Sequence, residues 1–167
     1  RFSLNALDAK RDLSLVAAGD QHGQVVLWKP QSGEQSVVPV ITRYPVFFLR
    51  FNAAGTLLLV SGYQGMAYLM QPDTMKLSAT FAGKFDMIEC AEFRSDDTIV
   101  ALHRPRSIKL WSPEGECLST MTIEAEAVRM ALSPDQTKVA VSTWDQTIEI
   151  WDLGTGKMQQ RLTGFHQ

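Results

Sequence analysis

The sequence predicts an all-β fold of four similar units, each made of four short antiparallel strands. A pattern recurs about every 40 residues, and a period of that length is typical of repeat architectures. The apolar runs are short and are separated by turn-forming residues, as strands require, and no window of about 11 residues shows a helical stripe. The 167 residues have the length of one domain of roughly 100–200 residues. We therefore expect a single domain, 1–167, with units at about 1–41, 42–82, 83–123 and 124–163.

Each unit is marked by a large apolar residue at the end of a strand. These anchors are Trp28, Met70, Trp111 and Trp151, and they stand 42, 41 and 40 residues apart. A polar turn containing Pro or Gly follows each anchor, which indicates a tight hairpin. A second marker, an apolar residue followed by a turn, lies about 19 residues before the anchors. It occurs at Phe51–Gly55, Phe93–Asp97 and Leu132–Gln136, with a weaker first copy at Leu7–Lys10.

Between these markers the chain contains three further kinds of strand. Continuous apolar runs are typical of a strand that is covered on both faces, and they occur at Leu15–Ala18, Leu57–Val60, Ile99–Leu102 and Val139–Val141. Polar and apolar residues alternate in the strands that end at two anchors, Ser107–Trp111 and Thr147–Trp151. A last strand follows each hairpin, at Val37–Ile41, Leu77–Phe81, Leu118–Ile123 and Met158–Leu162.

The composition excludes several classes of protein. Hydrophobic residues make up 45% and charged residues 20% of the chain, and 16 basic residues against 18 acidic ones give a net charge of −2. Disordered chains are less hydrophobic and more highly charged, and a protein that binds nucleic acid through charge alone has a large excess of Lys and Arg. No apolar run approaches the roughly 18 residues of a membrane span. We therefore expect a globular domain with neither nucleic acid nor membrane as its partner.

The two cysteines, Cys90 and Cys117, are too few for a disulfide framework and too far apart in sequence for a zinc-binding pair. The strand assignment puts Cys90 on the first strand of the third unit and Cys117 at the start of its last strand. Three strand spacings of about 4.8 Å separate these positions by roughly 14 Å, whereas a disulfide needs Cα atoms within about 7 Å. We expect two free thiols. The residues leave localisation open, with the cytoplasm mildly favoured.

The repeat length, the anchor Trp and the Ser-Pro-Asp turn together resemble the WD-repeat (WD40-type) β-propeller family. The likeness is strongest in the last unit, at Leu132–Asp135, Val139–Ser142, Asp145–Ile148 and Trp151–Asp152. The resemblance implies that each unit is a degenerate four-stranded blade in which Trp28, Trp111, Asp145 and Trp151 are structural residues. In the family, an Asp six residues before the Trp joins a hydrogen-bonded tetrad. Only Asp145 keeps this position, with Thr143 as its expected hydroxyl partner, and the Gly-His pair of the tetrad is missing.

The chain has only part of the sequence motifs of two other groups of propeller proteins. Residues Asp152–Lys157 resemble the turn of the tryptophan-docking repeat of quinoprotein dehydrogenase propellers, but Gln160 stands where that repeat has Trp. Proteins that dock ubiquitin-ligase adaptors have Arg two positions after Trp-Asp, where this chain has Gly154. The three histidines, at positions 22, 103 and 166, fall in different units or at the end of the chain, and we expect them in loops. We predict no catalytic, metal or cofactor site and no enzyme; a fragment of an enzymatic or ligand-binding propeller is the alternative.

The resemblance also implies a partner-binding face, built from the loops between second and third strands and from the segments that connect successive blades. Aromatic and Arg side chains, which dominate binding energy at interfaces, are frequent there. The candidates are Tyr44, Tyr63, Phe85, Arg104, Arg106 and Trp144. Mixed charge on this face favours a protein or peptide partner, so we predict a non-catalytic protein-interaction scaffold. The alternative for each aromatic is packing between adjacent blades.

The four units are not expected to close into a ring by themselves. Propellers of this family usually close with about seven blades, and a strand from one terminus usually completes a blade begun at the other. Here each of the four units has its own last strand, so the resemblance implies an open arc or part of a larger propeller. Further blades of the same chain, a second copy or a partner subunit would complete it. Gly164-Phe165-His166 resembles the start of another connecting segment.

Overall fold

Strands are the regular secondary structure of this protein. The computed structural model describes residues 3–38, 42–62, 65–82 and 87–164, and in these ranges it contains sixteen β-strands and no helix. The strands are β1 (Leu4–Ala9), β2 (Val16–Asp20), β3 (Val25–Trp28), β4 (Gln35–Val38), β5 (Val46–Phe51), β6 (Leu58–Gly62), β7 (Met66–Gln71), β8 (Lys76–Ala82), β9 (Ile88–Phe93), β10 (Ile99–His103), β11 (Ser107–Trp111), β12 (Cys117–Thr122), β13 (Ala127–Leu132), β14 (Lys138–Thr143), β15 (Ile148–Asp152) and β16 (Lys157–Leu162).

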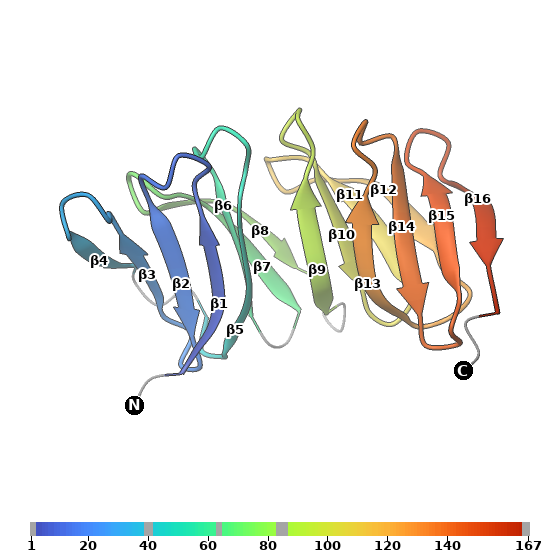
Figure 1. Ribbon diagram of the computed structural model, residues 1–167, viewed down its shortest axis with the longest axis horizontal. Helices are drawn as coiled ribbons and strands as arrows, with labels where there is room; N and C mark the ends of the chain where they lie inside the picture. The colour runs from blue at the N-terminus through green and yellow to red at the C-terminus, as the bar shows by residue number, and fades with distance from the viewer. Residues whose placement is uncertain (1–2, 39–41, 63–64, 83–86, 165–167) are drawn as a thin grey trace. The chain divides into compact units, whose positions relative to one another are not determined.

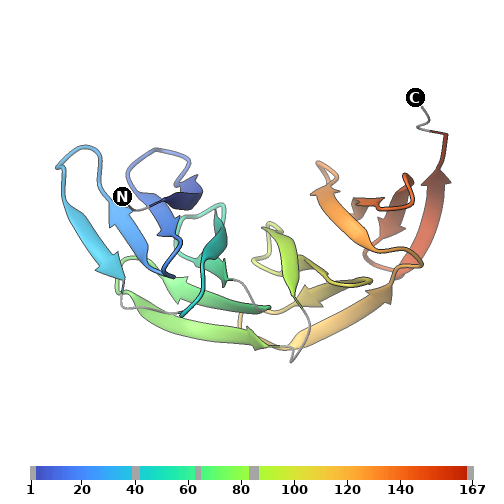
Figure 2. The same ribbon diagram turned by 90° about the horizontal axis from the view of Figure 1, so that it is seen from below.

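The strands form four separate antiparallel sheets, each of four strands in chain order. Sheet 1 contains β1–β4, sheet 2 β5–β8, sheet 3 β9–β12 and sheet 4 β13–β16 (Figure 1). Because every strand pairs with its sequence neighbour, each sheet is a simple meander, and the colours of Figure 2 follow one another across each sheet. The all-β fold with four four-stranded units is confirmed. None of the sheets closes into a barrel, as expected for blades of a partial propeller.

The sheets pack in two compact units. The first unit, Arg1–Asp86 with Pro113–Gly115, holds sheets 1 and 2, and the second, Met87–Ser112 with Glu116–Gln167, holds sheets 3 and 4. Apolar side chains from both sheets form the core of the first unit: Leu15, Ala17, Val25, Leu27, Val38, Val46, Leu49, Phe51, Leu58, Val60 and Met70. The core of the second unit contains Val100, Leu102, Ile108, Leu110, Met121, Ile123, Ala127, Val139, Val141, Trp151 and Leu153.

A close backbone contact in the first unit, and hydrogen bonds in both units, join the two sheets of each unit. In the first unit Gly19 of β2 faces Val46 of β5, and a Cβ at position 19 would lie only 2.4 Å from Val46 Cγ1. The backbone N–H of Phe51 donates to Asp8 Oδ2 at 2.7 Å. In the second unit the N–H of Ser95 donates to Gln136 Oε1 at 2.6 Å. Since these bonds join residues more than 40 positions apart, they fix one sheet against the next.

The second strands of the four sheets differ in burial. All residues of β6 and β10 are buried, as the apolar runs predict. In β2 and β14, however, buried residues alternate with half-buried ones. The expectation that these two strands are covered on both faces is wrong: one face of sheet 1 and one face of sheet 4 are only partly covered.

A β-bulge recurs in the first strand of every sheet. Near the start of β1, β5, β9 and β13 the pairing with the second strand shifts by one residue, and the extra residues are Asn5, Phe47, Glu89 and Val128. An extra residue of this kind bends the strand and redirects a side chain. The same irregularity in all four sheets shows that the repeat extends to details of hydrogen bonding.

Two local predictions are settled by the strand positions. Residues 152–157 form the β15–β16 hairpin turn, in which Asp152 Oδ1 accepts hydrogen bonds from the Thr155 N–H at 2.7 Å and hydroxyl at 2.8 Å. Cys90 lies in β9 and Cys117 begins β12, and both thiols are free, as predicted.

Candidate interaction face

Hairpin loops and connecting segments lie together at one end of the second unit. Four backbone hydrogen bonds join them: Arg104 N to Met87 O at 2.7 Å, Ala127 N to Pro105 O at 3.4 Å, Ile123 N to Arg106 O at 2.8 Å, and Trp144 N to Glu126 O at 2.8 Å. The β10–β11 and β14–β15 hairpins are thereby attached to the segments that precede β9 and β13. This end of the unit is a continuous, hydrogen-bonded surface rather than a set of independent loops.

Trp144 is the most exposed large aromatic side chain among the described residues of this end. It lies in the β14–β15 turn and keeps 66% of its surface exposed. Its backbone is held by Glu126, so the exposed indole stands on a fixed loop. Arg106, in the β10–β11 turn, is also exposed. Both residues have the accessibility that a binding residue needs.

Arg104 has a different environment. Its Nε lies 2.7 Å from Glu89 Oε2 and its Nη1 lies 3.8 Å from Glu126 Oε1. Arg129 Nη1 contacts the second oxygen of Glu89 at 2.9 Å. Glu89 is the bulge residue of β9, so the bulge directs a half-buried carboxylate between two arginines. Arg104 therefore links the connecting segment and the hairpin.

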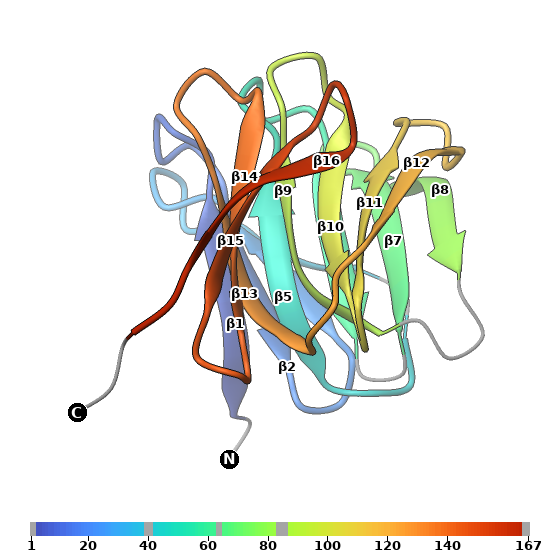
Figure 3. The same ribbon diagram turned by 90° about the vertical axis from the view of Figure 1, so that its right-hand side faces the viewer.

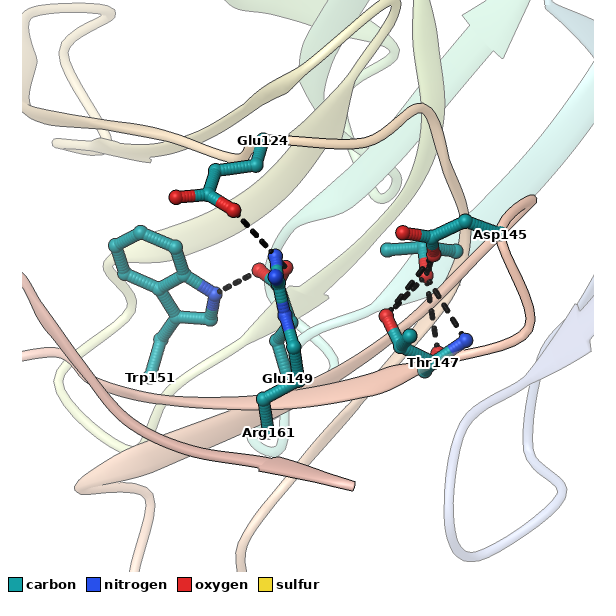
Figure 4. Close-up of polar contacts among 7 residues, drawn as sticks. Glu124, Asp145, Thr147, Glu149, Trp151 and Arg161 are labelled. Atoms are coloured by element: carbon teal, nitrogen blue, oxygen red, sulfur yellow. Dashed lines mark hydrogen bonds and ion pairs between the residues drawn. The ribbon is translucent and has the colours of Figure 1, made fainter. Parts of the chain in front are cut away.

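A buried carboxylate organises the adjoining part of sheet 4 (Figure 4). Glu149 of β15 is fully buried, and its Oε2 accepts the Trp151 indole N–H at 2.8 Å. Its other oxygen accepts a hydrogen bond from Arg161 Nη2 of β16, which also contacts Glu124 Oε2 at 2.8 Å. These contacts run from the core Trp through the ion pair of buried Glu149 with Arg161, whose side chain is 30% exposed, to the segment before β13. Hydrogen bonds to Glu149 and then to Glu124 raise the pKa of Arg161, which stays charged.

Asp145 makes the contact with Thr143 that the family resemblance implies. Its Oδ1 accepts hydrogen bonds from the Thr143 hydroxyl and, at 3.0 Å, from the Thr147 hydroxyl (Figure 4). Donation by Thr143 and then Thr147 lowers the pKa of Asp145. The indole of Trp151, in contrast, bonds to Glu149. The Asp and the Trp of this blade thus belong to two separate networks, whereas the family tetrad combines them.

In sheet 3 a histidine accepts the hydrogen bond of the anchor Trp indole. The Trp111 indole N–H donates to His103 Nε2 at 3.2 Å, and the two rings lie 5.9 Å apart between centroids. His103 is the last residue of β10 and is only 1% exposed, so its predicted loop position is wrong. His22 does lie in the β2–β3 turn, and His166 is outside the described residues. The strand continues through position 103 because the backbone of His103 pairs with Ile88 of β9 and with Ser107 of β11.

In the described part of the first unit, the β2–β3 turn lies against the segment before β5. Asp20 Oδ1 accepts the backbone N–H groups of His22 and Gln24, each at 2.8 Å, and closes the β2–β3 turn. Gly23 in this turn has φ +84°, and a Cβ there would lie 2.1 Å from the Thr42 carbonyl oxygen. The turn therefore packs directly on the segment that carries Tyr44, whose side chain is 40% exposed.

The structure places the predicted site residues as follows. Arg104, Arg106 and Trp144 share the loop end of the second unit, and Tyr44 belongs to the first unit. Tyr63 and Phe85 lie outside the described residues. Among the structural candidates, Trp111 and Trp151 are each 8% exposed, whereas Trp28 is 41% exposed.

Glu149 and Arg161 adjoin this face through Glu124, and the sequence pattern alone does not identify them. A signal for them exists, since β-strand alternation puts residues 149 and 151 on the same face. The β15–β16 register then sets Glu149 opposite Arg161. The alternation alone suggests an exposed polar face, and only the covering sheet shows that this face is buried.

Two other features are absent from the residues that the structure describes. No group of three or more His, Cys, Asp or Glu side chains has an arrangement that could hold a metal ion. No helix there is long and apolar enough to cross a bilayer.

Known proteins similar to this chain contain WD repeats. Residues 115–152 match the family described as "WD domain, G-beta repeat". The chain is 26% identical over 168 residues to Protein ROOT INITIATION DEFECTIVE 3 of Arabidopsis thaliana, an alignment that covers 89% of this chain and 37% of that protein.

Two further relatives show similar partial coverage. The U5 small nuclear ribonucleoprotein 40 kDa protein of Homo sapiens is 21% identical over 98% of this chain and 48% of its own length. Protein Notchless of Drosophila melanogaster is 31% identical over 71 residues, or 42% of this chain and 14% of its own length. The chain thus spans less than half the length of these relatives.

Proposed function

We propose that this member of the WD-repeat family is a non-catalytic scaffold that binds a protein or peptide through the loop end of its second unit. The observation that carries the proposal is the exposed Trp144 indole on a loop fixed by the backbone of Glu126. Pre-organised aromatic residues lose little conformational entropy on binding, and Trp and Arg are the residue types that contribute most at interfaces.

The charges around Trp144 support a polypeptide partner. Glu124, Glu126 and Asp145 stand beside Arg104 and Arg106 on this end of the unit. A nucleic acid would be repelled by the carboxylates, because binding to its phosphates depends on an excess of cations. A protein surface can present both signs of charge. The name of one relative describes a component of a ribonucleoprotein, which agrees with a role in an assembly.

The test compares partners captured by the chain and by variants of the face. Trp144→Ala and Arg106→Ala remove the exposed side chains and leave the backbone bonds in place. With a captured partner purified, Trp144→Ala should raise Kd roughly thirtyfold, the equivalent of about 2 kcal/mol for a central interface residue.

The matched control is Leu118→Ala, which truncates a leucine of β12 that is 54% exposed and lies away from these loops. It should leave Kd unchanged. The proposal is overturned if both face variants bind the partner as the wild type does while substitutions in the hairpins of Pro30, Pro72 or Pro113 abolish binding. That result would place the partner at the opposite ends of the sheets.

A further inference from the structure

A pocket of about 190 Å³ lies between the β3–β4 and β7–β8 hairpins of the first unit. Its floor is apolar, because Leu15 and Leu27 are buried core residues and Met75 packs against the same core. A cavity of about 150 Å³ with apolar walls is large enough to hold a benzene molecule. The pocket therefore has room for one aliphatic or aromatic side chain.

The second unit has a leucine at a position that borders this pocket in the first unit. The β7–β8 and β15–β16 hairpins have the same length and register, so Pro72, which lines the pocket, is equivalent to Leu153 (Figure 3). Leu153 is only 6% exposed and lies in the core that contains Leu110, the equivalent of Leu27. Because a proline ring reaches less far than a leucine side chain, the first unit has open space beside the equivalent position.

Met75 gives the pocket an adaptable wall. Its backbone has φ +56°, in the left-handed region that favours glycine, and the equivalent residue of the β15–β16 hairpin is Gly156, with φ +67°. A methionine at this position strains the turn, whereas its flexible thioether side chain can adjust to a bound apolar group. The turn does not need methionine, but the pocket is lined by it.

The charges at the mouth of the pocket favour a basic neighbour for the bound side chain. Three charged residues line it, and two of them, Glu34 and Asp73, are acidic. Lys29 pairs with Glu34 at 2.9 Å. Asp73 contacts Lys10 at 3.4 Å, yet the Asp73 side chain remains 72% exposed, whereas Lys10 is 18% exposed. A carboxylate accepts several hydrogen bonds, so Asp73 can also receive a cation from outside.

We propose that this pocket binds a leucine side chain of a partner polypeptide in which a Lys or Arg stands next to the leucine. The bound leucine supplies to the first unit the apolar group that Leu153 supplies to the second, and the basic side chain pairs with Asp73. The site belongs to the first unit. It is independent of the function proposed for the loop end of the second unit.

Methionine methyl NMR of the full chain tests the proposal. The probe is the capped peptide acetyl-Ser-Leu-Arg-Ser-amide, and Met75→Gly identifies which of the seven methionine signals belongs to Met75. The peptide should shift that signal saturably, with a Kd of roughly millimolar, as expected for a ligand of this size. A peptide with Ala in place of Leu should bind at least about tenfold more weakly, and one with Glu in place of Arg should also bind more weakly. Absence of a shift, or equal binding of the Leu and Ala peptides, would overturn the proposal.

Pro72→Leu recreates the leucine of the second unit and gives the decisive measurement. Its side chain should fill the pocket from inside, so that peptide binding falls at least about tenfold while circular dichroism shows a folded chain. If this variant does not fold, Met75→Gly, which removes a wall at a turn position suited to glycine, should weaken binding by a similar factor, measured by saturation transfer to the leucine methyl groups of the peptide.

The matched control is Trp144→Ala, which changes the loop end of the second unit and should leave the Kd of the peptide unchanged. This control separates a failure of the pocket from a failure of the function proposed for the second unit. Wild-type affinity in folded Pro72→Leu or in Met75→Gly would overturn the proposal, and so would loss of peptide binding in Trp144→Ala.

Discussion

Replacing Glu149 by Gln tests whether its buried carboxylate holds sheet 4 together. The change keeps the side-chain volume but removes the charge, and it presents an NH2 group where two donors, the Trp151 indole and the Arg161 guanidinium, now converge. A hydrogen bond to a charged group contributes about 1.5–3 kcal/mol. Disrupting a fully buried ion pair costs about 3–5 kcal/mol, which is an upper bound here because the Arg161 side chain is 30% exposed. Because one amide oxygen remains to accept one bond, we expect the free energy of unfolding to fall by about 2–3 kcal/mol.

Urea denaturation followed by tryptophan fluorescence measures this loss. With a slope of about 2 kcal/mol per molar urea, the midpoint should fall by about 1 M or more. The matched control is Arg129→Gln, which breaks the pair with Glu89 at a side chain that is 69% exposed. Exposed pairs contribute about 0–1 kcal/mol, so this midpoint should move little. If Glu149→Gln shifts the midpoint no more than Arg129→Gln does, the buried network is not a source of stability.

Three more predictions follow from single contacts. Gly19→Ala should lower the free energy of unfolding by about 1–3 kcal/mol, because the added methyl group overpacks against Val46. Adding Val46→Ala to this variant should recover part of that free energy in a denaturation experiment. If the single and the double variant lose the same free energy of unfolding, the steric explanation is refuted. Cys117, which is exposed, should react with a thiol reagent at pH 8 at once, whereas Cys90, whose pKa burial raises to about 11, should react only on unfolding. Two threonine hydroxyls lower the pKa of Asp145, so its stabilising effect is complete above the unfolded pKa of about 3.8 and is lost as pH falls through the lower folded pKa. Denaturation midpoints between pH 5 and pH 2 should therefore fall less steeply for Asp145→Asn than for the wild type, and equal slopes would contradict this.

The order of strands could be predicted from the sequence because the signals are local. An anchor such as Trp151 and the turn after it lie within a few residues, and hairpin pairing depends on neighbours in the chain. Even so, the last strand of the first unit begins two residues earlier than predicted: β4 is Gln35–Val38, whereas the apolar run predicts Val37–Ile41, of which 39–41 lie outside the described residues. Polar residues 35 and 36 join the strand because the β3 register continues through them.

The buried polar groups could not be predicted, because their burial depends on a neighbouring sheet. Alternation in Thr147–Trp151 shows that two faces of β15 differ, but it does not say which face is covered. In the structure the polar Thr147 and Glu149 are buried with Trp151, and Ile148 and Ile150 are half-buried. The interior position of His103 cannot be predicted from the sequence for the same reason. A polar side chain enters the interior where a specific donor is present to pair with it. Trp111 of β11 supplies that donor to His103, and Trp151 of β15 and Arg161 of β16 supply it to Glu149.

The β-bulges in the first strands have a consequence for how such a protein diversifies. Each bulge adds one residue that has no partner in the ladder, so its identity is not constrained by cross-strand packing. The four positions hold Asn5, Phe47, Glu89 and Val128, which are amide, aromatic, acid and aliphatic side chains. A substitution there changes the chemistry displayed by one repeat while the hydrogen-bonded scaffold stays as it is. New binding preferences can therefore evolve one repeat at a time at exposed bulge positions such as Asn5 and Phe47, whereas replacing Glu89 would also break its ion pairs with Arg104 and Arg129.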